Sequence, residues 1–151
     1  MLFRSSNRAG WGYLAMCLGW SGDEAEVEEA QQILDRLFPQ APDHPSVPYW
    51  YFFRAAACAR QGRHQESFDA ARLCLELNPG YYLVRGPHAN ALGFLGRLDE
   101  ARESWRTALA INPTFTPEFY RELARGIMVI EDRAQPHYGG LVAAGLLPAE
   151  A

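Results

Sequence analysis

Apolar and polar positions along this chain recur at a fixed interval of 34 residues. The segment Gln61–Ser67 aligns with Leu95–Ala101 at that offset, and Leu75–Pro79 aligns with Leu109–Pro113 with no insertion between the two matches. Two separate matches at one offset indicate an internal repeat. A repeat of this length fits a unit of two helices joined by a short turn.

The breaks in the pattern fall where two-helix units require them. Gly62 and Gly96 each follow an expected helix, and glycine readily adopts the left-handed conformation that ends one. Asn-Pro pairs at 78–79 and 112–113 stop the second helix of each unit. Helices that pack closely also need small side chains where their backbones approach. Small residues stand at these positions: Ala15, Ala30, Ala55, Ser67, Cys74, Ala89, Ala101 and Ala108.

The repeat resembles that of the tetratricopeptide repeat family, which has the same period and the same helix-turn-helix unit. The pattern is carried in the first unit by Trp11, Leu14, Ala15, Leu18 and Gly22, in the second by Tyr51, Ala55, Cys58, Gly62, Ser67, Cys74 and Pro79, and in the third by Ala89, Leu92, Gly96, Ala101, Trp105, Ala108 and Pro113. The resemblance implies an all-α fold, a right-handed superhelical solenoid of about three units with C-terminal capping helices. The expected units span about 5–42, 48–80 and 82–114, within a single domain of residues 1–151.

Three segments depart from the strict repeat. The first unit has about one additional helical turn in the acidic stretch Asp23–Glu29, so its second helix is expected to begin early. Pro39–Pro48 contains four prolines and is interpreted as a longer turn, with a hinge between subdomains as the alternative. After the third unit, Thr116 can cap a further helix and Pro117 suits its first position.

A C-terminal cap is expected over residues 116–147. Apolar residues of Glu131–Leu147 would cover the last repeat, which has no further unit to pack against. Phe115–Pro117 and Tyr138–Pro148 also resemble the end of the repeat region in bacterial class III adenylate cyclases and related signalling proteins. That second resemblance implies a regulatory repeat module without its enzyme, because no part of a cyclase catalytic domain is visible.

Composition narrows the class of partner and the compartment. A formal net charge of −4 disfavours nucleic acid and membrane surfaces, because both need clustered positive charge. All fourteen basic residues are arginine, which fits either carboxylate recognition or codon bias in a GC-rich genome.

The three cysteines are far apart and indicate neither a disulfide framework nor a thiolate metal site. Trp11–Trp20 is too short for a membrane span and lacks a signal peptide's cleavage region, so we expect a protein of the bacterial cytoplasm.

No set of residues in the sequence predicts catalysis, a metal site or a cofactor. His44, His64, His88 and His137 include no pair four residues apart, the spacing that places two metal ligands on one helix face. Gly93–Gly96 lies in an expected helix and its turn, and therefore does not form a phosphate-binding loop after a strand. No serine stands in a sequence arrangement that singles out a triad. The chain is accordingly expected not to be an enzyme.

The first helices of the units are expected to line a concave groove. By alignment with the family pattern, its residues are Met16, Trp20, Tyr49, Phe52, Ala56, Arg60, Leu83, Gly86, Asn90 and Phe94, with Tyr120 and Arg121 extending it. This set is mostly aromatic and aliphatic, which suits an extended or helical peptide with apolar anchors. Arg60 and Asn90 are its only polar handles, whereas the family's best-known peptide mode uses several Lys, Arg and Asn residues to clamp a terminal carboxylate.

Three functions remain open at this point. The first is a non-catalytic protein-protein interaction module that binds a peptide or protein partner in the groove. The second is a self-associating structural or regulatory module, in which the exposed aromatic residues contact another copy of the chain. The third is a hidden signalling enzyme, suggested by the resemblance of the tail to adenylate cyclases.

Overall fold

A computed structural model describes residues 7–21, 23–127 and 131–149. These residues form eight α-helices and a short 3-10 helix, with no strand among them. The helices are α1 (Arg8–Ser21), α2 (Glu24–Gln40), α3 (Val47–Arg60), α4 (His64–Leu77), η2 (Tyr82–Val84), α5 (Arg85–Phe94), α6 (Leu98–Ile111), α7 (Pro117–Ile127) and α8 (Glu131–Ala143). The predicted all-α class is therefore confirmed. Residues 5, 6 and 22 of the expected first unit and 128–130 of the expected cap lie outside the described residues, so the predicted role of Gly22 is not described.

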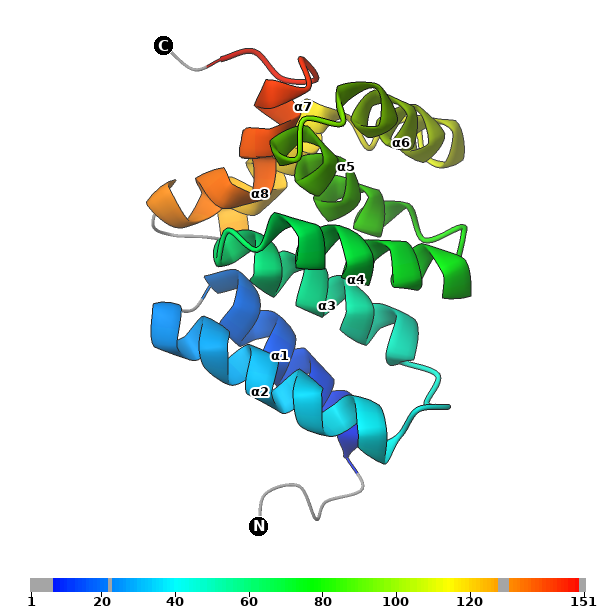
Figure 1. The fold of residues 1–151 in the computed structure, drawn as a ribbon, viewed down its shortest axis with the longest axis vertical. Coiled ribbons are helices and arrows are strands. Elements are labelled where there is room, and N and C mark those ends of the chain that lie inside the picture. The colour runs from blue at the N-terminus through cyan, green and yellow to red at the C-terminus, as the bar shows by residue number, and fades with distance from the viewer. Residues whose placement is uncertain (1–6, 22, 128–130, 150–151) are drawn as a thin grey trace.

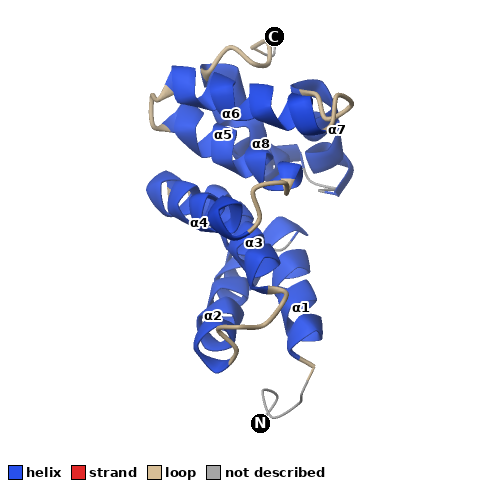
Figure 2. Ribbon diagram, turned by 90° about the vertical axis from the view of Figure 1, so that its right-hand side faces the viewer, coloured by secondary structure: helices blue, strands red, loops and turns tan. Residues whose placement is uncertain are grey.

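The first six helices form three hairpins that stack along the long axis of the molecule (Figure 1). α1 packs on α2, α3 on α4 and α5 on α6, and the second helix of each hairpin contacts the first helix of the next. Contacts of α3 with α1 and with α5 join the first helices into an inner layer. The side view in Figure 2 shows the second helices lying outside it.

Several helix ends follow the chemistry predicted from the sequence. α2 begins directly after Asp23, whose carboxylate accepts a hydrogen bond from the Glu26 backbone N–H at 2.9 Å while the Glu26 carboxylate accepts one from the Asp23 N–H at 2.7 Å. The early start of this helix is therefore confirmed. Gly62 and Gly96 end α3 and α5 with φ of 69° and 76°. The Thr116 hydroxyl accepts a backbone N–H at the start of α7.

The core fills the space between the two layers of helices. All eight small residues predicted at the helix crossings are buried. The Ser67 hydroxyl donates a hydrogen bond to the Ala55 carbonyl at 2.7 Å and so joins α4 to α3. Towards the C-terminus, Trp105 stacks on Phe115 with ring centroids 5.2 Å apart, and its indole N–H donates to the Phe115 carbonyl at 3.2 Å. These two polar groups of the core therefore have partners.

The last helix covers the third hairpin from the concave side. α8 packs chiefly on α5, and also contacts α7 and α3, so the chain turns back across the inner layer. His137 of α8 reaches the end of α1, where it stacks on Trp20 with ring centroids 4.7 Å apart and planes only 5° from parallel. The cap therefore covers the last repeat and extends across the inner layer as far as the first hairpin.

The backbones of α5 and α8 touch where they cross. A Cβ atom added to Gly93 would lie 1.8 Å from the Gly140 carbonyl oxygen, and a Cβ added to Gly140 would lie 1.8 Å from the Asn90 carbonyl oxygen. Both distances are far below van der Waals contact, and the obstructing atoms are backbone atoms that cannot rotate away. Glycine is therefore required at both positions of this crossing.

We predict that Gly140→Ala lowers the free energy of unfolding by about 1–3 kcal/mol, because the added methyl forces the two helices apart. Urea unfolding followed by circular dichroism measures the change. Gly126→Ala is the matched control, since Gly126 lies in α7 with no atom within 4 Å of an added Cβ. That control should raise the free energy of unfolding by up to about 1 kcal/mol through helix propensity. Equal effects of the two substitutions would contradict the backbone contact.

Candidate functional site

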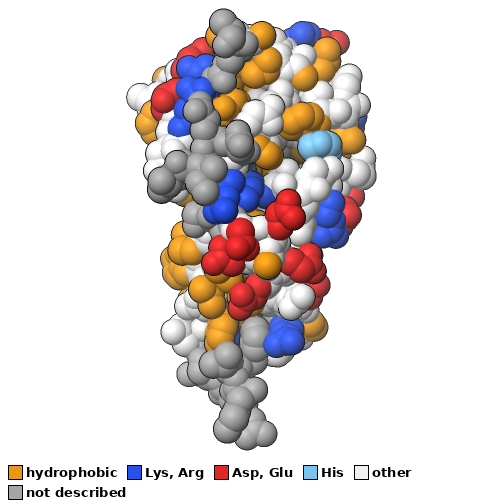
Figure 3. Space-filling model, turned by 90° about the vertical axis from the view of Figure 1, so that its left-hand side faces the viewer, with side chains coloured by type: hydrophobic (Ala, Val, Ile, Leu, Met, Phe, Trp, Pro, Cys, Tyr) orange, Lys and Arg blue, Asp and Glu red, His pale blue; other side chains and the backbone are white. Residues whose placement is uncertain are grey.

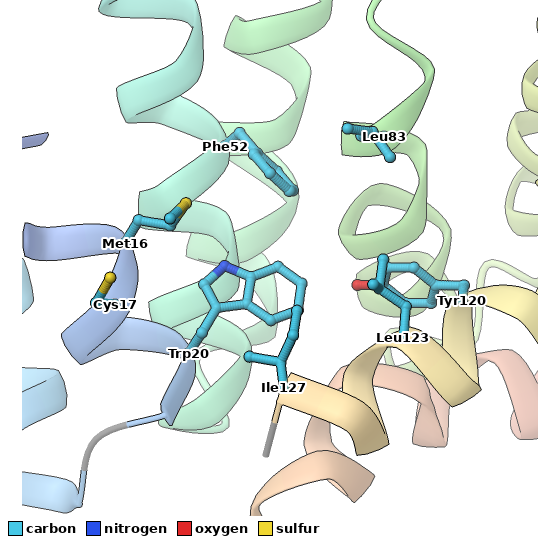
Figure 4. Close-up of a pocket in the computed structure, with 8 residues that line it drawn as sticks. All are labelled: Met16, Cys17, Trp20, Phe52, Leu83, Tyr120, Leu123 and Ile127. Atoms are coloured by element: carbon cyan, nitrogen blue, oxygen red, sulfur yellow. The ribbon is translucent and has the colours of Figure 1, made fainter. Parts of the chain in front are cut away.

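A groove of two adjoining compartments runs along the inner layer, and Met16, Phe52 and Leu83 line both of them. The inner compartment, between α1, α3, η2 and α7, is lined by Met16, Cys17, Trp20, Phe52, Leu83, Tyr120, Leu123 and Ile127 (Figure 4). The outer compartment is lined by Ala9, Tyr13, Met16, Ser46, Tyr49, Trp50, Phe52, Phe53, Tyr81 and Leu83. Each has a volume of about 320 Å³.

Six of the twelve predicted groove residues line these compartments. Met16, Trp20, Phe52, Leu83 and Tyr120 lie in the inner one, and Tyr49 lies in the outer one. The sequence reasoning missed Leu123 and Ile127, which share a helix face with Tyr120 at spacings of three and seven residues. That helical spacing was the signal that could have identified them.

Six predicted residues lie outside both compartments. Gly86 is buried in α5, and Arg121 forms an ion pair with Glu122. Ala56 is buried within the core. Phe94 stacks on His64 with ring centroids 4.1 Å apart. Arg60 donates a hydrogen bond from Nη1 to the Trp20 carbonyl at 2.8 Å. Asn90 is fully buried beneath α8. Both expected polar handles therefore bond to the protein's own backbone, Arg60 to α1 and Asn90 to α8.

Asn90 holds α8 by pairing with its backbone. Its side-chain nitrogen donates to the Pro136 carbonyl at 2.9 Å, and its side-chain oxygen accepts from the Gly140 N–H at 2.8 Å. In an α-helix, the carbonyl of one residue and the N–H four residues later are each other's regular partners. The Asn90 amide thus bonds to the carbonyl and the N–H of one i, i+4 pair of α8. Because both ends of the amide have partners, this polar side chain can be fully buried.

The inner compartment carries no charged side chain. Its lining consists of apolar and aromatic residues, and burial raises the pKa of Tyr120, which keeps that hydroxyl neutral. Two polar atoms in its walls, Trp20 Nε1 and the Tyr120 hydroxyl, are buried and lack a hydrogen-bond partner among the residues that the structure describes. The Tyr120 hydroxyl points towards Trp20, whose nitrogen lies on the ring edge facing Met16 and Phe52 (Figure 4).

His137 stacks on Trp20, which lines the inner compartment, and is fully buried. Neither of its ring nitrogens has a hydrogen-bond partner within the described part of the chain. Burial, assisted by the positive charge of Arg60, lowers the pKa of His137 to about 3. The imidazole is therefore neutral near pH 7 and acts as an aromatic packing group.

A second polar pair, which the sequence did not single out, lies on the other side of α5. His88 Nδ1 lies 2.7 Å from the Ser104 hydroxyl oxygen. Burial lowers the pKa of His88 to about 4, which makes it a poor general base near neutral pH. The pair is best explained as a structural link between α5 and α6.

The buried cysteines have a packing role, and the charged side chains form a solvated surface. Burial raises the pKa of the Cys58 thiol, and that of Cys74 to about 12, so both thiols are unreactive. In the acidic stretch Asp23–Glu29 every residue except Val27 is exposed, and acidic side chains gather beside arginines on the face shown in Figure 3. Acidic residues at this helix start also complement the helix dipole.

Neither a metal cluster nor a membrane span is found in the described ranges. Within 7–21, 23–127 and 131–149 no three His, Cys, Asp or Glu residues are grouped so that they could hold a metal ion. No helix in the same ranges is long and apolar enough to cross a bilayer.

Two solved structures share this architecture. MamA MSR-1 is 24% identical over 80% of this chain and 67% of its own, with a TM-score of 0.52. MamA AMB-1 is 24% identical over 83% of this chain and 67% of its own, with a TM-score of 0.53. MamA contains tetratricopeptide repeats, so these matches confirm the predicted helical solenoid, and at this identity they show the fold alone. No protein-family model and no curated protein sequence matches the chain. The comparisons do not support the resemblance of the tail to adenylate cyclases.

Burial of neutral His137 predicts a loss of stability in acid. Unfolded histidine has a pKa of about 6.5, so below that pH the unfolded chain binds a proton that the folded chain excludes. The free energy of unfolding should fall as the pH drops from about 6.5 towards 3, by up to about 1.4 kcal/mol per pH unit for this residue.

Urea unfolding of the wild type and of His137→Phe across this pH range tests the prediction. Phenylalanine keeps an aromatic ring against Trp20 but cannot take up a proton. The stability of His137→Phe relative to the wild type should therefore rise as the pH falls, and the contribution of His88 cancels because both proteins retain it. A difference that stays constant with pH would show that His137 does not titrate on unfolding.

Proposed function

We propose that this chain is a non-catalytic protein-protein interaction module that binds a peptide or protein partner in its concave groove. The observation that carries the proposal is the groove itself, which is apolar and has aromatic side chains at its rim. Tyr13 is 62% exposed and Tyr49 is 41% exposed at the outer compartment. Apolar patches of this kind on a folded surface mark interaction sites.

The aromatic side chains that line the outer compartment pack against one another and are therefore ordered before a partner binds. The Tyr81 ring meets Tyr49 and Phe52 edge to face, with centroids 5.1 and 5.5 Å apart, and Tyr13 lies 6.5 Å from Phe53. Aromatic rings fixed by one another lose little freedom on binding, and tyrosine adds a polar end at the rim. Apolar anchors of a peptide can therefore pack across α1 and α3.

Recognition of a terminal carboxylate is not part of this proposal. Arg60 donates to the Trp20 carbonyl, and Asn90 is occupied by the backbone of α8. A partner in the groove accordingly meets aromatic and aliphatic side chains, and its apolar residues determine the affinity. The tetratricopeptide scaffold shared with MamA fits a protein-interaction role, as an analogy at the level of fold.

The three cysteines are free thiols, which fits a reducing compartment such as the bacterial cytoplasm. The proposal therefore places the partner there.

Substitutions at the rim should reduce partner capture without unfolding the protein. Tyr13→Ala with Tyr49→Ala removes two exposed rings of the outer compartment, and we expect at least about a tenfold loss of affinity, as for the strongest aromatic contacts of interfaces. Affinity capture followed by mass spectrometry identifies the partners, and calorimetry with a purified partner measures the affinity.

The matched control is Leu77→Ala with Ile111→Ala. These side chains are 56% and 44% exposed but lie at the ends of the outer helices α4 and α6. The control protein should capture the same partners as the wild type. Loss of the same partners in both double variants would place the interaction elsewhere than in the groove.

A self-associating module is the second candidate function, and exposed apolar residues at both ends of the stack favour it. Tyr13 and Leu14 lie on α1, whereas Ile111 and Phe119 lie on α6 and α7. Contact between opposite ends of successive copies would be head to tail and would not close on itself.

Sedimentation velocity over a range of protein concentrations tests this second function. Head-to-tail association predicts a sedimentation coefficient that rises with concentration and returns to that of the monomer in Phe119→Asp. A wild-type protein that sediments as a monomer at every concentration would exclude it.

A further inference from the structure

The inner compartment has the dimensions of a small-molecule site. Its volume of about 320 Å³ falls in the range of cavities that bind small molecules, which is roughly 300–1,000 Å³. Its walls come from four different elements, so the space is fixed by the packing of the whole inner layer. Ile127, which is 42% exposed, and Cys17, which is also exposed, line its edge and leave a route from solvent.

Two hydrogen-bond donors in these walls lack partners. Trp20 is 6% exposed and Tyr120 is 1% exposed, and within the described residues neither the indole Nε1 nor the phenol oxygen has a hydrogen-bond partner. Buried polar groups are nearly always paired, because an unpaired one destabilises the folded state. Other buried groups of this core, the Trp105 N–H and the Ser67 hydroxyl, have partners, whereas the ring nitrogens of His137 and the Gln31 side-chain oxygen also lack one among the described residues.

The chemistry of these donors defines the missing partner. An indole N–H can only donate, so its partner must be an acceptor, and the neutral Tyr120 hydroxyl can donate to the same kind of atom. The other lining residues are aliphatic, aromatic or sulfur-containing, and they favour an apolar body. A charged ligand would lose its hydration without meeting an opposite charge in the lining.

We propose that the inner compartment binds a small uncharged ligand with an apolar body and an acceptor oxygen, such as a ketone or an ester. The apolar body packs between Met16, Phe52 and Leu83. The oxygen accepts a hydrogen bond from the Tyr120 hydroxyl, which points into the space beside Trp20 (Figure 4). This site goes beyond the proposed function, because it needs no protein partner.

The fluorescent ketone Prodan, which joins an uncharged naphthalene body to a carbonyl oxygen, is the probe. Its carbonyl-free dimethylaminonaphthalene parent is the matched ligand. Fluorescence titration of the wild type should show saturable binding of Prodan with a blue-shifted emission, and weaker binding of the parent. Equal affinity for the two compounds, or no saturable binding of Prodan, would overturn the proposal.

Variants separate the donor from the apolar walls. Tyr120→Phe removes the donor and should weaken Prodan binding about threefold to tenfold, the effect of one hydrogen bond, while binding of the parent stays within about twofold. Leu83→Trp fills the space and should abolish binding of both compounds. Tyr82→Phe, at a tyrosine outside the compartment lining, is the control and should bind Prodan as the wild type does.

The melting temperature of the ligand-free protein distinguishes a binding role from a structural one. Removing an unpaired buried hydroxyl should leave the melting temperature of Tyr120→Phe unchanged or higher, while its affinity for Prodan falls. A lower melting temperature together with unchanged Prodan affinity would show that the hydroxyl is structural and would overturn the proposal. The rim variants Tyr13→Ala and Tyr49→Ala should bind Prodan normally, so a failure of this site is distinguishable from a failure of protein binding.

Discussion

The crossing of α5 and α8, where Gly93 and Gly140 let two backbones touch, determines which part of the concave face is open. A side chain at either glycine would move α8 away from the inner layer. With the crossing intact, Asn90 pairs with the α8 backbone, and the C-terminal part of the inner layer is covered. The open groove is what remains between α1, α3, η2 and α7.

The same crossing also constrains the first hairpin, because α8 carries a residue that packs against the end of α1. Because α8 lies across the inner layer, its His137 meets Trp20 ring to ring and limits where the indole can lie. The carbonyl of Trp20 in turn accepts from Arg60 of α3. Residues from two other helices, α8 and α3, therefore hold Trp20 in place, while its indole nitrogen has no partner among the described residues. The burial of neutral His137 and the unpaired indole N–H both follow from the position of α8 across the inner layer.

Local features of this chain were predictable because neighbouring residues determine them. The left-handed turns at Gly62 and Gly96 and the capping box at Asp23 each involve a few consecutive positions. The helix pairing followed from the repeat, and six of the fifteen residues that line the groove followed from alignment with the repeat pattern. The position of α8 did not follow, because it depends on contacts between residues about fifty positions apart. Asn90 was misplaced for that reason, although two glycines inside a C-terminal helix were a visible sign of close packing. Arg60 was misplaced because its guanidinium donates to the Trp20 carbonyl of α1, a contact forty positions apart.

The use of polar residues separates this solenoid from carboxylate-binding relatives of its fold. Where a terminal carboxylate needs exposed cationic and amide side chains, Arg60 and Asn90 here satisfy carbonyl and N–H groups of the protein's own backbone. The groove that remains contains apolar walls and two buried donors without protein partners among the described residues. Such a surface selects ligands by their shape and by whether they carry an acceptor atom. It disfavours charged ligands, because no opposite charge in the lining offsets the cost of desolvating an ion. Selectivity in this protein therefore follows from which polar groups the fold leaves unpaired.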